Sequence, residues 1–267
     1  MHAFSALEIW QGAATLGVPL EEYLTDLRDA GLSSLPGTAA EILDDEVRQV
    51  ICPDKVTTAQ WLDVHDVAHR VGLRSNVTMM FGHVEGPRNW ARHLVRAREQ
   101  QRSSGGFTEF VPLPFVHMEA PMWLRGQARS GPTFGETLLV HAIARLALHP
   151  WITNIQVSWV KLGAQGVGVA LRAGVNDLGG TLMNESISRS AGAAHGQEFA
   201  PEAMEALIRS AGRIPRQRTT LYSDAPEERR LASFGAAPLA EPLNPPVKDA
   251  RLVAPPRLVR PGVAASG

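Results

Sequence analysis

A chain of 267 residues with 44% hydrophobic and 20% charged residues is typical of a globular protein with one large domain or two small ones. Its formal net charge of -1 excludes the strongly basic surface that nucleic acid or an anionic membrane requires, and no apolar run is long enough to cross a bilayer. Cys52 is the only cysteine, so the chain contains neither a disulfide framework nor a set of cysteine ligands for a metal. The first residues show no signal-peptide pattern, and we therefore predict a cytoplasmic protein that binds no nucleic acid and no membrane.

Helices with clear end signals alternate with short strands in the first part of the chain. Ser5 to Glu8 is a capping box that begins a helix ending before Gly17, and Pro19 begins a second helix. Hydrophobic periodicity predicts further helices from residue 44 and over residues 58–71, 87–104 and 133–149, with strands at 32–35, 74–81 and 106–115. Pro112 and Pro114 cannot donate to a ladder, so we expect the last of these strands to end its pairing there.

The stretch from Trp151 to Glu185 has the strongest strand signal. The apolar, β-branched run 152–162 predicts a fully buried parallel strand, followed by a helical segment at 164–173 and a second short strand at 175–178. In a (β/α) barrel the chemistry is carried out where strands end. Polar residues of this stretch fall at or just after predicted strand ends: Gln156, Ser158, Lys161, Asn176, Asp177, Thr181, Asn184 and Glu185.

The spacing of these elements predicts an α/β fold. About five strands, with a sixth near Phe4, repeat with helices between them, whereas a complete TIM-type barrel has eight. We therefore predict an open sheet or the C-terminal part of a barrel, about five to six βα units, whose start lies elsewhere. Residues 1–222 form the predicted barrel region, and the Pro- and Ala-rich residues 223–267 are predicted to be a disordered tail.

Local chemistry alone does not name a reaction. His83 at a strand end suits a proton donor, although the residues alone favour a surface loop. Glu41 suits a ligand contact but equally a carboxylate in the first turn of a helix. Asn176 and Asp177 either point into the mouth of the barrel or mark a turn before Gly179. The sequence has no dinucleotide fingerprint, catalytic-serine elbow, zinc-binding His pair or phosphate loop.

Five segments nevertheless form a recognisable series. They are PGTAAEIL (36–43), TMMFGH (78–83), EFVPLPF (109–115), QVSWVKLG (156–163) and NDLGGTLM (176–183). In this order they resemble the radical S-adenosylmethionine (SAM) enzymes of deazaflavin biosynthesis, in particular the CofH-type half of FO synthase. The resemblance covers roughly residues 2–222 and implies a radical SAM (β/α) TIM-type barrel.

The resemblance implies a transferase of coenzyme F-420 biosynthesis that couples L-tyrosine to 5-amino-6-(D-ribitylamino)uracil through its 4-hydroxyphenyl or 4-hydroxybenzyl group. The implied cofactors are SAM and a 4Fe-4S cluster, and the implied further partner is a CofG-type radical SAM domain or a missing N-terminal part. The family's three-cysteine cluster loop has no counterpart in this sequence, so we expect the cluster ligands to be absent from this chain and its activity alone to be impaired.

The same resemblance implies roles for ten residues and assigns none to a metal. His83, Asp177 and Glu185 take catalytic roles. Trp159, Asn176 and Gln156 bind substrate. Glu41, Thr78, Met80 and Pro112 lie toward the cofactor. Two alternatives stay open: a non-catalytic partial barrel that binds a ligand or completes another chain, and a futalosine-type radical SAM enzyme of menaquinone biosynthesis.

Overall fold

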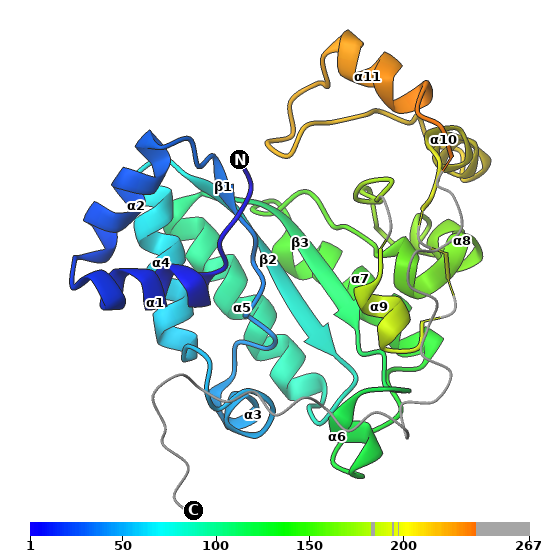
Figure 1. The fold of residues 1–267 in the computed structure, drawn as a ribbon. Helices are drawn as coiled ribbons and strands as arrows, with labels where there is room; N and C mark the ends of the chain where they lie inside the picture. Colours follow the sequence, from blue (N-terminus) through cyan, green and yellow to red (C-terminus); the bar gives the residue numbers. More distant parts are fainter. Residues whose placement is uncertain (183–184, 194, 197, 239–267) are drawn as a thin grey trace, which may run out of the picture.

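A row of parallel strands forms the centre of the protein (Figure 1). The computed structural model describes residues 1–182, 185–193, 195–196 and 198–238. Its strands are β1 (Ser34–Leu35), β2 (Arg74–Phe81) and β3 (Phe107–Pro114), and they lie in that spatial order.

Single parallel bridges lengthen this row on both sides. His2 pairs with Ser34 beyond β1, Phe110 of β3 pairs with Ile155, and Gln156 pairs in turn with Asp177. The residues near Phe4 thus lie beside β1, as the predicted sixth strand requires.

Helices precede and follow the strands, as expected for βα units. Capping boxes at Ser5, Thr57 and Thr133 begin three of them, since each side chain accepts a backbone N–H that the helix leaves free. The helices are α1 (Ala6–Leu16), α2 (Leu20–Asp29), α3 (Asp45–Ile51), α4 (Thr58–Arg70), α5 (Pro87–Ser104), α6 (Pro121–Leu124), α7 (Phe134–Leu148), α8 (Trp159–Ala170), α9 (Ile187–Ser190), α10 (Pro201–Ser210) and α11 (Glu227–Phe234).

The two faces of β2 differ in what they contact. Val77, Met79 and Phe81 are fully buried in the hydrophobic core, which lies between the sheet and helices such as α4 and α5. Because side chains alternate along a strand, Asn76 and Met80 point to the opposite face, which we call the inner face.

A β-bulge turns a carboxylate onto this inner face. Ser75 pairs with Phe107 and Val77 with Phe110, so two steps along β2 oppose three along β3. Phe107 and Phe110 both lie in the core. Because of the extra residue, Phe107 and Phe110 face the same side although they are three positions apart. Glu109, directly before Phe110, therefore points to the inner face.

The long strand predicted at 152–162 is wrong. Only Ile155 and Gln156 make parallel bridges there, and α8 begins at Trp159. Its buried residues recur at helical spacing (Trp159, Val160, Gly163, Gly166, Val167 and Ala170), so the apolar run is the buried side of a helix. Lys161 therefore lies in the first turn of α8 and not at the end of a strand.

The prediction for Pro112 and Pro114 holds on one side of β3 only. Pairing with β2 continues through both prolines, from Met79 with Pro112 to Phe81 with Pro114. On the other side, Phe110 donates to Asn154 and accepts from Gln156, and no strand pairing is recorded beyond it among the described residues. Alternation places the missing N–H groups of both prolines on this second side, which explains why that pairing is short.

The segment predicted to be a disordered tail begins with a helix. Residues 227–234 form α11, in which Glu227 pairs with Arg230 one turn later and the Arg230 guanidinium lies 6.0 Å from the ring centroid of Phe234. The remainder of the predicted tail, residues 239–267, lies outside the described residues. None of the described helices is both long enough and apolar enough to cross a membrane.

Candidate active site

A polar cluster occupies the inner face near the start of β3. Gln156 donates to Glu109 Oε2 at 3.1 Å and to Asp177 Oδ1 at 3.4 Å, and Asn76 donates to Glu109 Oε1 at 3.1 Å. Side chains from four neighbouring segments of the parallel row thus meet at the carboxylates of Glu109 and Asp177, both of which are buried.

The chain after α10 supplies the counter-charge to these carboxylates. Arg218 Nη2 lies 3.0 Å from both Glu109 Oε2 and Asp177 Oδ1, and the hydroxyl of Tyr222 hydrogen-bonds with the same two carboxylates. The guanidinium also lies 4.0 Å from the ring centroid of Tyr222. Figure 1 shows this segment, in orange, returning from α10 across the end of the sheet where the strands begin. We call Glu109, Asp177, Arg218 and Tyr222 the inner-face ion cluster.

Burial changes the protonation equilibria in this cluster. Desolvation raises the pKa of the Glu109 carboxyl above its ordinary value, although Tyr222 and Arg218 act in the opposite direction. Desolvation and the two neighbouring carboxylates raise the pKa of the Tyr222 hydroxyl, which therefore stays protonated and can donate. Because one guanidinium faces two carboxylates, the cluster carries a residual negative charge when both carboxylates are ionised.

The loop after β1 crosses the inner face of β2. The Thr78 hydroxyl donates to the Gly37 carbonyl at 2.7 Å, and the Met80 N–H donates to the Glu41 carbonyl at 2.7 Å. A Cβ added at Gly37 would lie 2.3 Å from the Asn76 carbonyl oxygen, so only glycine allows this approach. Two of the residues predicted to face the cofactor, Glu41 and Met80, are therefore adjacent.

This loop holds strained backbone. Ala39 and Glu41 have φ values of 63° and 45°, in the left-handed region that residues with a Cβ rarely adopt. Arg48 stabilises the loop from α3, since its buried guanidinium donates to the carbonyls of Ala39, Ala40 and Val56. The Glu41 carboxylate itself pairs with Lys55 at 2.8 Å.

His83 lies in a tight turn at the end of β2. Its side chain is 1% exposed, with Nδ1 2.8 Å from Glu85 Oε2 and Nε2 3.1 Å from the Met80 carbonyl. The Glu85 carboxylate also accepts the N–H groups of Gly82 and His83 and the Trp90 indole N–H. Burial alone would raise the pKa of Glu85, but the contacts with His83, Gly82 and Trp90 outweigh it and hold the pKa at about 2.

The remaining predicted site residues on the second half of the sheet lie apart from one another. Trp159 is buried, donates to the Gly180 carbonyl at 2.9 Å and packs against Phe199. Asn176 is exposed and binds Arg145 and the backbone N–H of Ile155, on the side of the segment opposite to Asp177. Glu185 lies two residues before α9, and its Oε1 accepts the Ser188 N–H at 2.9 Å.

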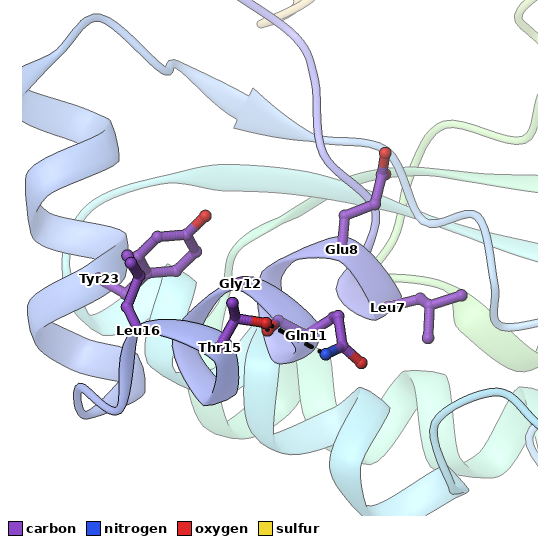
Figure 2. Close-up of a pocket in the computed structure, with 7 residues that line it drawn as sticks. All are labelled: Leu7, Glu8, Gln11, Gly12, Thr15, Leu16 and Tyr23. Carbon is purple, nitrogen blue, oxygen red and sulfur yellow. Dashed lines mark hydrogen bonds between the residues drawn. The ribbon is translucent and has the colours of Figure 1, made fainter. Parts of the chain in front are cut away.

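One surface groove lies away from these residues. It is an open groove of about 620 Å³ along the outer side of α1, lined by Leu7, Glu8, Gln11, Gly12, Thr15, Leu16 and Tyr23. Figure 2 shows Tyr23 on α2 near Gly12, with Gln11 and Thr15 joined by a hydrogen bond of 3.2 Å. A second cavity of about 360 Å³ lies beside the loop after β3 and the start of α8, at the end of the sheet where barrel enzymes bind substrate.

Comparison with known proteins identifies the C-terminal part of this chain. The profile of the CofH/MqnC C-terminal region matches residues 104–230. This stretch is similar to that family. The resemblance found in the sequence to CofH-type FO synthase is thereby confirmed.

Curated relatives share about half of their residues with this chain. An FO synthase of Streptomyces coelicolor is 52% identical over 233 residues, which are 87% of this chain and 27% of the relative. An FO synthase of Mycobacterium tuberculosis H37Rv is 52% identical over 223 residues, 84% of this chain and 26% of the relative. A 5-amino-6-(D-ribitylamino)uracil–L-tyrosine 4-hydroxyphenyl transferase of Methanothermobacter thermautotrophicus is 50% identical over 224 residues, 84% of this chain and 61% of the relative. The chain thus spans about a quarter of the FO synthases and 61% of the transferase.

A solved structure supports the fold. The crystal structure of methylornithine synthase (PylB) aligns with a TM-score of 0.55 at 15% identity, over 85% of this chain and 65% of that one. At this identity the likeness shows the fold alone. Together with the parallel row of strands, it confirms the predicted α/β class of a partial TIM-type barrel.

The structure brings some of the predicted residues together and leaves others apart. Gln156 joins Asp177, and Met80 contacts both Glu41 and His83 through its backbone, whereas Asn176 faces away from all of them. Sequence reasoning missed the partners Glu109, Arg218, Tyr222 and Glu85. A carboxylate inside the apolar strand at 107–114 was a usable signal for Glu109, and the basic segment after residue 212 was one for Arg218.

Proposed function

We propose that this chain forms the substrate-binding part of a CofH-type enzyme of coenzyme F-420 biosynthesis, a 5-amino-6-(D-ribitylamino)uracil–L-tyrosine 4-hydroxyphenyl transferase. The observation that carries the proposal is 50% identity to the transferase of that name over 84% of this chain. The 52% identity to two FO synthases supports the same reaction.

The inner face offers the contacts that a ribityl-uracil requires. Met80 and Leu113 are register partners on adjacent strands and are both partly exposed, so they form an apolar surface for a flat ring. The inner-face ion cluster and Gln156 lie on the same face and supply the polar groups. In this proposal Gln156 and Trp159 contact the substrate, and Asn176 holds the bridged segment to Arg145.

The three proposed catalytic residues differ in how their side chains are engaged. Asp177 is paired with Arg218 and His83 is enclosed by Glu85, so both are held in fixed orientations. Within the described residues, Glu185 is the one of the three with a buried carboxylate oxygen, Oε2, that has no hydrogen-bond partner. We assign Glu185 to direct substrate contact, and Asp177 and His83 to orienting their neighbours at the strand ends.

The implied cofactors fit the chain unequally. Glu41, Thr78 and Met80 lie on the loop after β1 or on the inner face of β2, so they are compatible with a SAM site there. Pro112 is the register partner of the core residue Met79 and therefore faces the helices. A 4Fe-4S cluster needs at least three thiolates in this family, and Cys52 supplies one, buried beside α3. The residues present do not fit the cluster, and no step of the reaction is derived through it.

The single cysteine favours one alternative, a non-catalytic partial barrel that binds the ligand for another chain. Such a protein and a transferase part would both bind the ribityl-uracil, and only the latter would form product when cluster thiolates are supplied by a CofG-type domain or an N-terminal part. The cytoplasmic location predicted from the sequence stays a prediction.

Calorimetric titration of the purified chain with 5-amino-6-(D-ribitylamino)uracil tests the proposal. We expect saturable binding that Gln156→Ala weakens about tenfold, the effect of losing one buried hydrogen-bond partner. Gln49→Ala, at an exposed position on α3, is the matched control and should bind as the parent does. Absence of binding, or equal binding by the parent and Gln156→Ala, would count against the inner face as the uracil site.

A further inference from the structure

A lysine without a partner lines the cavity at the ends of the strands. Lys161 lies in the first turn of α8, is half-buried and borders the cavity of about 360 Å³. Within the described residues its ammonium makes neither a hydrogen bond nor an ion pair, and its Nζ is not sealed in the interior, so a ligand can reach it. A partly desolvated ammonium without a counter-charge is unfavourable, so this position favours an anionic ligand.

The lining of the cavity carries nitrogen groups and no carboxylate. The imidazoles of His117 and His195 line it together with Lys161, and none of the described residues around it is an aspartate or a glutamate. A neutral imidazole has one N–H that can donate to a carboxylate oxygen. Burial lowers the pKa of Lys161, and the charge of Glu185 acts in the opposite direction, although the two form no ion pair in the described part of the chain. The lining therefore selects an anion over a cation.

A glycine at the kink of α8 lets His195 lie against the turn that carries Lys161. Gly163 has a φ of 65°, in the left-handed region that favours glycine. A Cβ added there would lie 2.5 Å from Cε1 and 2.7 Å from Nδ1 of His195. Because both the backbone conformation and this close approach require glycine, Gly163 allows the imidazole to share the cavity with Lys161.

Aromatic rings form part of the wall beside these nitrogen groups. Phe115, directly after β3, and Phe134, at the start of α7, both line the cavity. The Phe115 ring also lies edge-on to the imidazole of His83, with 6.0 Å between the ring centroids, so the cavity adjoins one of the proposed catalytic residues. A ligand with an aromatic body and one negative end matches this lining.

We propose that this cavity binds the carboxylate of an aromatic substrate, with Lys161 as its counter-ion and with Phe115 and Phe134 against its ring. Inorganic phosphate would gain the charge without the ring contacts, and an aromatic amine would meet an unpaired ammonium, so an aromatic carboxylate suits the lining better than either. The inference rests on the proposed function, in which L-tyrosine is an aromatic carboxylate and the ribityl-uracil has no carboxylate.

Calorimetric titration of the full chain with matched probes tests this site. The probes are L-tyrosine, 3-(4-hydroxyphenyl)propanoate, which keeps the carboxylate, and tyramine, which lacks it. We expect both carboxylates to bind more tightly than tyramine, by about tenfold or more. Lys161→Met should weaken both carboxylates by about the same factor and leave or improve tyramine, whereas Lys161→Arg should keep part of the affinity. Phe134→Ala, at a half-exposed position, should weaken all three probes.

Controls separate ligand binding from folding. Arg172→Met removes an exposed positive charge just after α8 and should bind every probe as the parent does. Lys161→Met replaces an unpaired, half-buried ammonium by an apolar side chain of similar length, so its melting temperature should equal or exceed that of the parent. If it melts at a lower temperature, the comparison of tyramine with the propanoate in this one variant still decides, because a partly unfolded protein would lose affinity for both.

The inference is overturned if Lys161→Met binds the propanoate as tightly as the parent does, or if the parent binds tyramine as tightly as the propanoate. Displacement of the bound propanoate by inorganic phosphate would also overturn it, because the cavity would then be a general anion site. Displacement by SAM, which carries a carboxylate of its own, would assign the cavity to the cofactor and would likewise overturn the inference.

Titration with the ribityl-uracil distinguishes this inference from the proposed function. Because that molecule has no carboxylate, we expect the parent and Lys161→Met to bind it equally well. Propanoate binding that depends on Lys161, in a chain that does not bind the ribityl-uracil, would support the carboxylate site and contradict the proposed function. Binding of the ribityl-uracil without carboxylate binding that depends on Lys161 would keep the proposed function and overturn the inference.

Discussion

The guanidinium of Arg218 forks onto the carboxylate of Asp177, with Nε donating to Oδ2 and Nη2 to Oδ1 at 3.0 Å, although 41 residues separate the two in the sequence. Arg218 also reaches Glu109, 109 residues away, so one side chain joins the C-terminal segment to two positions of the parallel row. This contact ties the C-terminal segment to the inner face near the end where the strands begin.

Replacing Arg218 should therefore destabilise the fold. Arg218→Met leaves two buried carboxylates without their cation, and we expect the free energy of unfolding to fall by about 3 kcal/mol. Urea denaturation measures this change. Arg216→Met is the control, because the Arg216–Asp224 pair is exposed and its loss should change stability little. Equal stability of the two variants would show that the inner-face ion cluster does not hold the segment.

The strained loop after β1 should depend on Arg48. Arg48→Met removes the donor to three backbone carbonyls, and we expect a loss of about 3 kcal/mol together with faster hydrogen exchange at residues 37–42. Arg70→Met, at an exposed position on α4, is the control. Unchanged exchange in this loop in Arg48→Met would mean that the contacts of Gly37 and Glu41 with β2 suffice to hold it.

Glu85 should contribute to acid unfolding. Its pKa of about 2 lies below the ordinary value of 4.5, so its stabilising effect is complete above about pH 4.5 and is lost as the pH falls toward 2. We expect Glu85→Gln to be less stable than the parent at neutral pH, by on the order of 2–3 kcal/mol, with the difference shrinking across this window. A difference that stays constant from pH 5 to pH 2.5 would contradict the assigned pKa.

His93 should give a second pH dependence at higher pH. Burial and the nearby charges of Arg48 and Arg96 lower its pKa from 6.5 to about 3, and its Nδ1 accepts the Leu43 N–H at 2.9 Å. Between these pH values the unfolded chain binds a proton that the folded chain excludes, so stability falls as the pH falls, by about 1.4 kcal/mol per pH unit. His93→Asn keeps an acceptor and does not titrate. The free energy of unfolding of His93→Asn should depend less on pH than that of the parent between pH 6.5 and pH 4. An equal pH dependence in the two proteins would show that His93 does not cause it.

Local signals in the sequence were sufficient for much of the fold. The bounds of β2 and α5 were predicted at 74–81 and 87–104, because Gly72 and Gly82 on either side of the strand, a proline at the first helical position and a glycine at the end of the helix are all local features. Thr133 was likewise predicted to begin α7. These elements determine which face of β2 meets the helices.

The errors have physical causes that a sequence does not display. The run at 152–162 is apolar in both a buried strand and a buried helix, and only its packing decides that α8 begins at Trp159. The bulge that turns Glu109 inward depends on the register with β2. The partner of Asp177 comes from a segment beyond α10, and the tertiary structure, not the spacing of the two residues in the sequence, brings such a long-range pair together. Asn176 and Asp177 are neighbours in sequence, and the alternation of a strand sends them to opposite faces.

The most direct test of the account is product formation by a chimera. In it, this chain replaces the matching 61% of the Methanothermobacter thermautotrophicus transferase, and the remainder of that relative is kept. The chimera is incubated anaerobically with L-tyrosine, 5-amino-6-(D-ribitylamino)uracil and SAM, and the coupled product is quantified by mass spectrometry. We expect coupled product at a rate within about tenfold of the parent transferase, and a steep loss of product with Glu185→Gln. A folded chimera that cleaves SAM but forms no coupled product would contradict the claim that this chain carries the substrate-binding part of the enzyme.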